Sequence, residues 1–280
     1  MKALKGELEV GRFRVPYRRY GTSPNLLVGV SGALQTMAVW SMFVKRFSDT
    51  FTVLIFDMPG IGKSEILDGP VQVSIEEHVQ VVHALVEAHR LGGSTTLAGS
   101  SWGTAICAAY ASRHPAEVDN LLLGSFGLKP NEAMRDVIKR AREVYDSGEW
   151  ATGASLIIDE FGQSISETYK KMIQAQFRAI TRDHAENFYE HCAYIERAGE
   201  LEDFVDLGNI SARTFIVNGA QDTILDLGDI HIAHEKIPNC RIAIIEGAGH
   251  FLHFERPELM ELYAEFLDGN DELPLAEYGG

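Results

Sequence analysis

The stretch Thr95-Thr96-Leu97-Ala98-Gly99-Ser100-Ser101-Trp102-Gly103 decides the fold of this 280-residue chain. Its first four residues predict a buried strand, and the alanine-rich run from Trp102 to Arg113 predicts a helix. The pattern G-x-S-x-G joins the two. In such a strand-to-helix turn, called a nucleophile elbow, the residues two before and two after the serine must be small because the turn leaves no room for side chains. The stretch therefore predicts that Ser101 presents its hydroxyl at the carboxyl end of a parallel strand.

Further apolar runs alternate with helical stretches along the chain. Strands are expected at Asn25–Ser31, Phe51–Asp57, Leu121–Gly124, Thr214–Asn218 and Arg241–Glu246, and helices at Val73–Leu91, Leu227–Lys236 and Arg256–Leu267. This alternation indicates an α/β fold with a mostly parallel, twisted sheet and helices on both faces. Ahead of it, Leu4–Val10 and Arg12–Tyr20 predict a β-hairpin, and Pro16 is expected to place the second strand at a sheet edge.

Residues 129–209 lack a strand signal and predict an inserted helical lid. Apolar residues recur at helical spacing in Met134–Tyr145, Leu156–Phe161, Tyr169–Ile180 and Ala185–Ile195, with breaks expected at Pro130, Gly148, Gly153, Gly162 and Thr181–Asp183. An insertion between parallel strands is most simply a lid over their carboxyl ends, where ligands bind. We therefore expect a core of residues 1–128 and 210–268, a lid at 129–209 and a loose tail at 269–280.

The composition excludes several classes of function. A net charge of −15 opposes binding to nucleic acid and to anionic membrane surfaces. Three widely spaced cysteines provide neither a disulfide framework nor the ligand spacing of a zinc site. The chain lacks dinucleotide and Walker motifs, so no nucleotide cofactor is expected. Without a Cys/His ligand spacing, no metal is expected either. It also lacks a signal-peptide pattern and any run of 18 apolar residues, so we expect a cytoplasmic protein without a membrane span.

A serine nucleophile requires a base and a carboxylate that orients the base. His250 follows the strand Arg241–Glu246 and is the candidate base. Asp222 follows the preceding strand and gives the order Ser…Asp…His that a nucleophile elbow of this kind requires. Asp226 and Asp229 are alternative acids, although both are placed to begin the next helix.

The remaining candidates concern the oxyanion and the other histidines. The loop Ser31–Thr36 follows a predicted strand, and the backbone N–H of Ala33 is expected to act with that of Trp102 as an oxyanion hole. The other histidines, among them His78 and His191, lie on or beside helical stretches, where a surface or satisfied core role is typical.

Four motifs, in this order, resemble those of the α/β-hydrolase superfamily: D-x-P-G-x-G-x-S at Asp57–Ser64, the elbow at Gly99–Gly103, N-G-x-x-D at Asn218–Asp222 and G-x-G-H at Gly247–His250. The resemblance implies the α/β-hydrolase fold with an inserted lid. It also implies covalent catalysis by Ser101, His250 and Asp222.

A narrower resemblance covers nearly the whole chain. The segments Ser31–Thr36, Ser101–Gly103 and Ser125–Asp136 are similar to those of bacterial 3-hydroxyacyl transferases, which make rhamnolipid precursors or move 3-hydroxyacyl chains between acyl carrier protein and coenzyme A. This resemblance implies a small-molecule acyl thioester as substrate, with coenzyme A or acyl carrier protein as the acyl donor. The residues expected to contact the substrate are Leu34, Phe126, Met134, Phe177 and Phe251.

Three positions depart from those transferases and leave alternatives open. Ser31 stands where they have asparagine, Ile224 where they have an aromatic residue, and Thr104 where they have a second glycine. Because each position is near the expected acyl site, chain length and acceptor can differ. A carboxylesterase or thioesterase with the same triad remains an alternative, as does a non-catalytic ligand receptor on the same scaffold.

Overall fold

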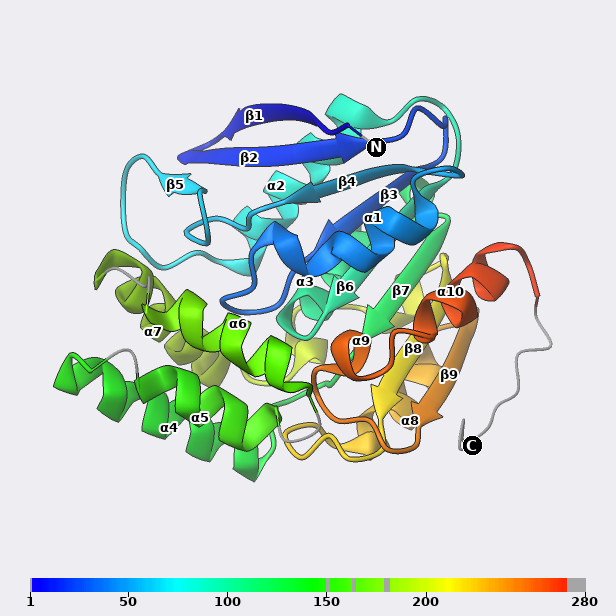
Figure 1. The fold of residues 1–280 in the computed structure, drawn as a ribbon. Helices are drawn as coiled ribbons and strands as arrows, with labels where there is room; N and C mark the ends of the chain where they lie inside the picture. Colours follow the sequence, from blue (N-terminus) through cyan, green and yellow to red (C-terminus); the bar gives the residue numbers. More distant parts are fainter. Residues whose placement is uncertain (1, 150–151, 163–164, 179–181, 271–280) are drawn as a thin grey trace.

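A nine-stranded sheet runs through the middle of the protein (Figure 1). The structure, a computed structural model, describes residues 2–149, 152–162, 165–178 and 182–270, without the side chains of residues 154, 176, 177, 184 and 198. The strands are β1 Leu4–Val10, β2 Phe13–Tyr20, β3 Leu26–Val30, β4 Thr52–Phe56, β5 Glu65–Ile66, β6 Thr95–Ser100, β7 Asn120–Gly124, β8 Arg213–Gly219 and β9 Cys240–Ile245. Their order is β1-β2-β4-β3-β6-β7-β8-β9, with β5 paired to β2. Neighbouring strands from β4 to β9 are parallel, which confirms the predicted class of fold.

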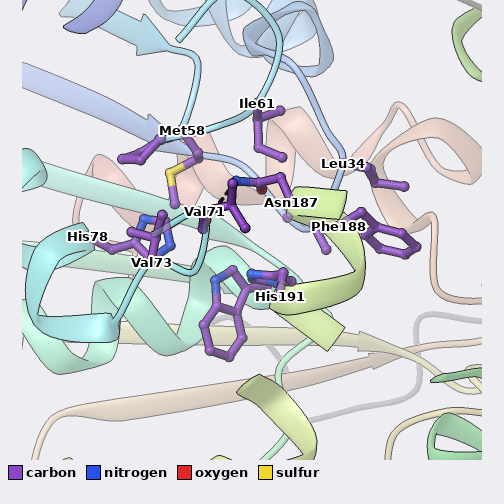
Figure 2. Close-up of a pocket in the computed structure, with 13 residues that line it drawn as sticks. Leu34, Met58, Ile61, Val71, Val73, His78, Asn187, Phe188 and His191 are labelled. Atoms are coloured by element: carbon purple, nitrogen blue, oxygen red, sulfur yellow. Dashed lines mark hydrogen bonds between the residues drawn. The ribbon is translucent and has the colours of Figure 1, made fainter. Parts of the chain in front are cut away.

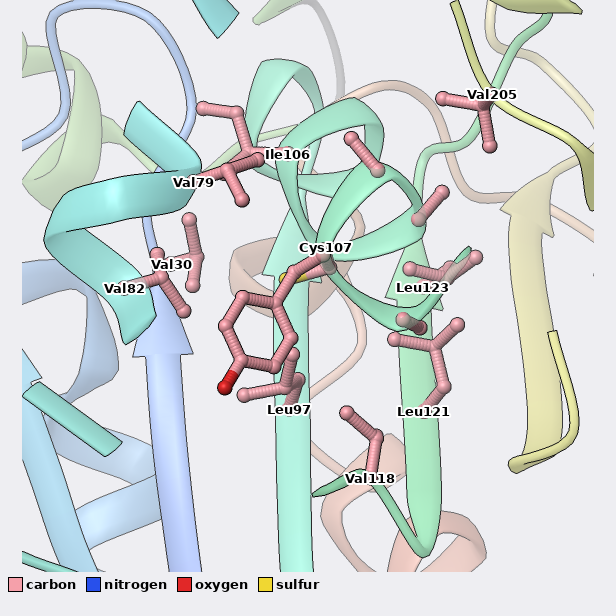
Figure 3. Packing of buried hydrophobic residues seen from close by; sticks show 14 of the residues in the cluster. Val30, Val79, Val82, Leu97, Ile106, Cys107, Val118, Leu121, Leu123 and Val205 are labelled. Atoms are coloured by element: carbon pink, nitrogen blue, oxygen red, sulfur yellow. The ribbon is translucent and has the colours of Figure 1, made fainter. Parts of the chain in front are cut away.

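Helices cover both faces of the sheet. On one face lie α1 (Ser41–Phe47) and α10 (Leu259–Leu267), which enclose an aromatic cluster. The opposite face is covered by α2 (Ile75–His89), α3 (Trp102–Arg113) and α8 (Leu227–Lys236). Because both faces are covered, every residue of β3, β4 and β7 is buried. Figure 3 shows the packing on the second face, where strand residues such as Leu97 and Leu121 lie among residues of α2 and α3.

The hairpin at the start forms as predicted, but Pro16 is not at a sheet edge. β2 pairs with β1 on one side and with β4 and β5 on the other. Its register with β4 starts only at Tyr17, while the Pro16 carbonyl accepts a hydrogen bond from the backbone N–H of Asp57. Pro16 therefore lies where this ladder begins, a position at which a missing N–H is tolerated. Proline is thus tolerated in this interior strand because it lies at the end of the β2–β4 ladder, and a position at the edge of the sheet is not required.

Among the described residues, four α-helices lie between β7 and β8: α4 Glu132–Ser147, α5 Thr152–Phe161, α6 Glu167–Arg178 and α7 Arg182–Ala198. They project from the carboxyl ends of the parallel strands (Figure 1). The side chain of Asn131 caps α4 by accepting from Met134 N at 2.9 Å, and Gly148 ends it with a φ of 71°. Gly153 was expected to be a break but lies inside α5, where it is buried. One glycine costs a helix only about 1 kcal/mol, so packing can retain it.

Short elements complete the fold: the 3-10 helices Met37–Trp40, Pro115–Glu117, Leu201–Asp203 and Leu207–Asn209, and the one-turn helix α9, Leu252–Glu255. Most of the tail expected at 269–280 lies outside the described residues, as does residue 181 of the last expected break. Across the described part of the chain, every helix is too short or too polar to cross a lipid bilayer.

Candidate active site

Ser101 lies in a strained turn between β6 and α3. Its backbone has φ 51° and ψ −122°, a conformation that an L-residue rarely adopts. A Cβ atom at Gly99 would lie 2.8 Å from the carbonyl oxygen of Gly103, and one at Gly103 would collide with the carbonyl oxygen of Val30. These two contacts are the physical reason for the glycines on either side of Ser101, and the turn has the geometry of a nucleophile elbow.

The structure brings Ser101, His250 and Asp222 together from loops after three different strands. His250 Nε2 lies 3.0 Å from Ser101 Oγ, and His250 Nδ1 lies 2.7 Å from Asp222 Oδ2. The Asp222 side chain is fully buried and that of His250 is 9% exposed. Asp222 Oδ1 also accepts from the backbone N–H of Ile224 at 3.2 Å. In this arrangement the imidazole can accept the serine proton while the carboxylate stabilises the resulting imidazolium.

Two further side chains hold the His250 loop and were missed in the sequence. Ser125 Oγ donates to the His250 carbonyl at 2.8 Å, and the Glu255 carboxylate accepts from Gly249 N at 2.5 Å. Burial raises the pKa of Glu255. Phe161, from α5, lies against the His250 ring with a centroid separation of 5.5 Å. The signal for Ser125 was its position directly after a buried strand, but Glu255 carries no local signal.

The loop Ser31–Thr36 lies beside the serine. Gly32 N donates to Gln35 Oε1 at 2.9 Å, and a Cβ atom at Gly32 would lie 3.1 Å from Ser101 Cβ. Leu34 has a φ of 59°, so Leu34, Ser101 and Ser125, the non-glycine residues with positive φ in the described chain, all lie around one site. Backbone strain of this kind clusters at functional sites. Trp102, the first residue of α3, places a helix N-terminus next to Ser101, where its dipole favours negative charge.

Two cavities, each of about 110 Å³, open from Ser101 and His250. The first, which we call the lid cavity, lies under the inserted helices and is lined mainly by Val137, Ile138, Ala141, Ile157, Phe161 and Ile173. The second, which we call the rear cavity, runs toward Leu128, Lys129, Leu201 and Phe204. The two cavities share Ala33, Ser101, Met134, Ile195, Ile224 and His250. The candidate nucleophile therefore lies at the junction of two largely apolar spaces.

The residues expected to contact substrate divide into three groups. Leu34, Met134 and Phe251 line the lid cavity. Phe126 does not line either cavity: it is fully buried in the core, where its N–H donates to Asn218 Oδ1 at 2.9 Å. Its neighbours Ser125 and Gly127 line the rear cavity instead. The direction of a side chain in a loop after a strand cannot be read from its position in the sequence. The side chain of Phe177 lies outside the described residues.

A third, smaller cavity of about 20 Å³ lies behind the Ser31–Thr36 loop (Figure 2). Ala33 and Trp102 line it together with His78 of α2 and His191 of α7. Burial lowers the pKa of His78 to about 3, with a further contribution from His191, and burial lowers the pKa of His191 to about 4. Both ring nitrogens of His78 and Nε2 of His191 are buried and make no hydrogen bond to a described residue, so the expected surface or satisfied role of these two histidines is not met.

Asp226 and Asp229, the alternative acids, accept hydrogen bonds from backbone N–H groups. Asp226 caps α8 by accepting from Gly228 N at 2.8 Å, and Asp229 accepts from Leu128 N at 2.7 Å at the start of the insertion. The turn at Asp57 is also structural, because its carboxylate accepts from the N–H groups of Met37 and Lys63.

One group of possible metal ligands, His83, His114 and Glu117, occurs among the described residues. The Glu117 carboxylate lies 3.3 Å from Nδ1 of each histidine and accepts from Tyr110 OH at 2.5 Å. These groups already partner one another at the amino end of the sheet, opposite Ser101, and we assign no metal to them.

Comparison with known proteins finds relatives of the same fold. The alpha/beta hydrolase fold family matches residues 25–148. The chain is 22% identical to the (R)-3-hydroxydecanoyl-ACP:CoA transacylase of Pseudomonas putida, over 90% of this chain and 85% of that protein. It is 24% identical to the human monoacylglycerol lipase ABHD6, over 89% of this chain and 77% of that protein. Among solved structures, MGS-M2, an alpha/beta hydrolase enzyme from a deep-sea metagenome library, has a TM-score of 0.82 at 19% identity, covering 96% of this chain and 99% of that one.

The protein thus has the α/β-hydrolase fold, and the resemblance to that superfamily indicated by the motifs is confirmed. The sequence resembles both (R)-3-hydroxydecanoyl-ACP:CoA transacylases and monoacylglycerol lipases.

Proposed function

We propose that the protein is an acyltransferase that forms a covalent acyl-enzyme on Ser101 and takes 3-hydroxyacyl thioesters as donors. The observation that carries the proposal is the position of Ser101 at the junction of the lid and rear cavities, within 3.0 Å of His250 Nε2. A thioester has a large group on each side of its carbonyl carbon. Two apolar cavities that meet at the nucleophile suit such a substrate.

In the first half of the reaction, His250 Nε2 takes the proton of Ser101 Oγ, and Oγ attacks the thioester carbonyl carbon. The N–H groups of Ala33 and Trp102 stabilise the oxyanion, while Asp222 stabilises the imidazolium. The carbon–sulfur bond then breaks, and the departing thiolate takes the proton from His250. The acyl group remains on Ser101 as an ester.

In the second half, His250 removes a proton from the acceptor, which attacks the ester carbonyl. A hydroxyl of a second hydroxyacyl chain gives an ester dimer, a different thiol gives a new thioester, and water gives the free acid. The proton returns through His250 to Ser101 Oγ. The apolar walls of both cavities favour acceptors larger than water because they exclude solvent from the ester.

The donor is coenzyme A or acyl carrier protein. An acidic carrier protein would be repelled by the net charge of −15, and would need a local basic surface. On α4, Arg135 and Lys139 are exposed. Arg140, by contrast, pairs with Asp136 and Glu160, which reduces the positive charge of this helix. Arg135 and Lys139 are therefore the residues we expect a carrier protein to contact.

Hydrolysis by the same triad is the rival function, and the similarity to a monoacylglycerol lipase supports it. Product analysis separates the two. The protein is incubated with 3-hydroxydecanoyl thioesters of coenzyme A and of acyl carrier protein, each with the second thiol present, and products are identified by mass spectrometry. Hydroxyacyl dimer or exchanged thioester supports transfer. Free 3-hydroxy acid alone identifies a hydrolase, and no acyl product from either donor contradicts the proposal.

A further inference from the structure

The cavity behind the Ser31–Thr36 loop contains buried polar atoms that lack partners. Both ring nitrogens of His78, Nε2 of His191 and Nε1 of Trp102 make no hydrogen bond to any described residue. His78 is only 3% exposed. A buried polar atom without a partner is destabilising, so four such atoms on three residues that line one cavity indicate that a polar group binds there.

The walls of this cavity are held in place by long-range contacts. Asn187 of α7 donates to the carbonyl of Val71 at 3.1 Å, and Tyr194 of the same helix accepts from Ile75 N at 3.3 Å. The ring of His191 packs edge-on against Trp102 with a centroid separation of 4.7 Å and an angle of 89°. Figure 2 shows His78 at one end of the cavity, Leu34 and Phe188 at the other, and His191 between them. The polar atoms are therefore fixed before any ligand arrives.

The chemistry of the walls specifies a small neutral group. The lining contains no charged side chain, and burial lowers the pKa of His78 and His191, which keeps both imidazoles neutral near pH 7. The indole of Trp102 only donates, whereas a neutral imidazole offers one donor and one acceptor. A hydroxyl, which both donates and accepts, matches this set, whereas a carboxylate or an ammonium group does not. The volume of about 20 Å³ is that of a water-sized group.

The cavity adjoins the proposed oxyanion hole, where the carbonyl of a bound acyl group would lie. Ala33 and Trp102, whose N–H groups are the proposed oxyanion donors, both line it, and Leu34 and Phe188 line both it and the lid cavity. A group that enters from the lid cavity must be attached to the acyl chain within a few bonds of the carbonyl carbon. A hydroxyl on one of the first carbon atoms of the acyl chain, counted from the carbonyl, meets this requirement.

We infer that His78, His191 and the indole N–H of Trp102 form a subsite that recognises a hydroxyl near the carbonyl of the acyl chain, and so select hydroxyacyl over plain acyl substrates. The inference rests on the proposed function and identifies the residues that determine its substrate class. A site built around a substrate hydroxyl discriminates against an analogue without it, because the buried polar groups are then left unpaired.

The test compares kcat/KM for 3-hydroxydecanoyl-CoA and decanoyl-CoA. For the wild type, we expect the hydroxylated substrate to be favoured about tenfold or more. His191→Phe and Trp102→Phe preserve an aromatic ring but remove the ring nitrogens, and each should lower this ratio toward one. Trp40→Phe is the matched control: it removes an indole N–H that donates to Ser31 Oγ outside the cavity, and the ratio should be retained.

Binding supplies a readout that is independent of turnover. The affinities of 3-hydroxydecanoate and decanoate for Ser101→Ala, measured by calorimetry, should show the same preference, and His191→Phe in that background should remove it. Equal kcat/KM values in the wild type, or a ratio that His191→Phe and Trp102→Phe leave unchanged, would overturn the subsite while leaving acyl transfer intact. If no acyl thioester is turned over, the proposed function fails. The existence of the subsite is then tested only by the calorimetric comparison of 3-hydroxydecanoate with decanoate.

Discussion

The carbonyl oxygen of Val30 lies directly against Cα of Gly103, so that even a methyl group at Gly103 would collide with it. Val30 ends β3 and Gly103 is the second residue of α3. The contact therefore joins the loop that carries Ala33 to the turn that carries Ser101. The two proposed oxyanion donors depend on this close approach for their relative position.

Gly103→Ala should consequently destabilise the protein by about 3 kcal/mol or more, because backbone atoms rather than flexible side chains must move. Urea unfolding at pH 7 measures the effect. The control is Gly148→Ala, at a glycine that has a φ of 71° but no atom near its missing Cβ. It should cost only about 1–2 kcal/mol, the strain of a left-handed alanine. Equal losses in the two variants would contradict the steric account of the elbow.

Asp222→Asn should preserve the fold and lower kcat for acyl-thioester turnover by about 10³–10⁴-fold, because an amide cannot stabilise the imidazolium and favours the wrong tautomer of His250. Steady-state kinetics measure this effect. Asp226→Asn is the matched control, because Asp226 caps α8 and makes no contact with the imidazole. Its kcat should stay near that of the wild type, and a comparable loss there would argue against Asp222 as the orienting acid.

The lid cavity should set the length of the acyl chain. Ala141→Phe fills part of this cavity, and we expect kcat/KM for decanoyl-CoA to fall at least about tenfold relative to butyryl-CoA. Ala133→Phe makes the same change on the same helix at an exposed position. Rates measured across a series of chain lengths should be unaltered in that variant. An unchanged length profile in Ala141→Phe would place the acyl chain elsewhere.

His253 should make stability depend on pH. It is buried against Phe43 and Tyr263, and burial lowers the pKa of its imidazole from 6.5 to about 4. Between these values the unfolded chain binds a proton that the folded chain does not, so stability falls as the pH drops from 6.5 to 4. At pH 5 this one group should cost about 2 kcal/mol relative to pH 7.

Urea unfolding of His253→Phe at both pH values tests this expectation. The variant should be less stable at pH 7, because the Tyr263 hydroxyl loses its partner, but it should lose about 2 kcal/mol less on acidification. His231→Gln, at an exposed histidine of α8, should show the wild-type loss. If His253→Phe shows the same loss on acidification as the wild type, His253 is not the cause.

Local patterns predicted much of the fold because they reflect local physics. Apolar runs gave the parallel strands, and the glycines around Ser101 gave the elbow, since both depend on residues close in the sequence. The order of Ser101, Asp222 and His250 followed from the strands that precede them, and their side chains meet within 3.0 Å. The predictions of a sheet edge at Pro16 and a helix break at Gly153 were wrong. At Pro16 the strand pairing, and at Gly153 the packing of the helix, outweighed the general preference of the residue.

The cavity with His78 and His191 could not be predicted in this way. Its two histidines lie on helices that are far apart in the sequence, and only the packing of α7 against the loop before α2 brings them together. The direction of Phe126 into the core has a similar origin, since Asn218 on a neighbouring strand fixes its backbone. Long-range contacts of this kind leave no periodicity in the sequence.

Ser101 should carry the acyl group during turnover. Intact-protein mass spectrometry after rapid mixing with 3-hydroxydecanoyl-CoA tests it most directly. We predict a species heavier than the wild-type protein by one hydroxydecanoyl group, located on Ser101 by peptide mapping and lacking in Ser101→Ala. Turnover without such a species, or an equal rate in Ser101→Ala, would contradict the account.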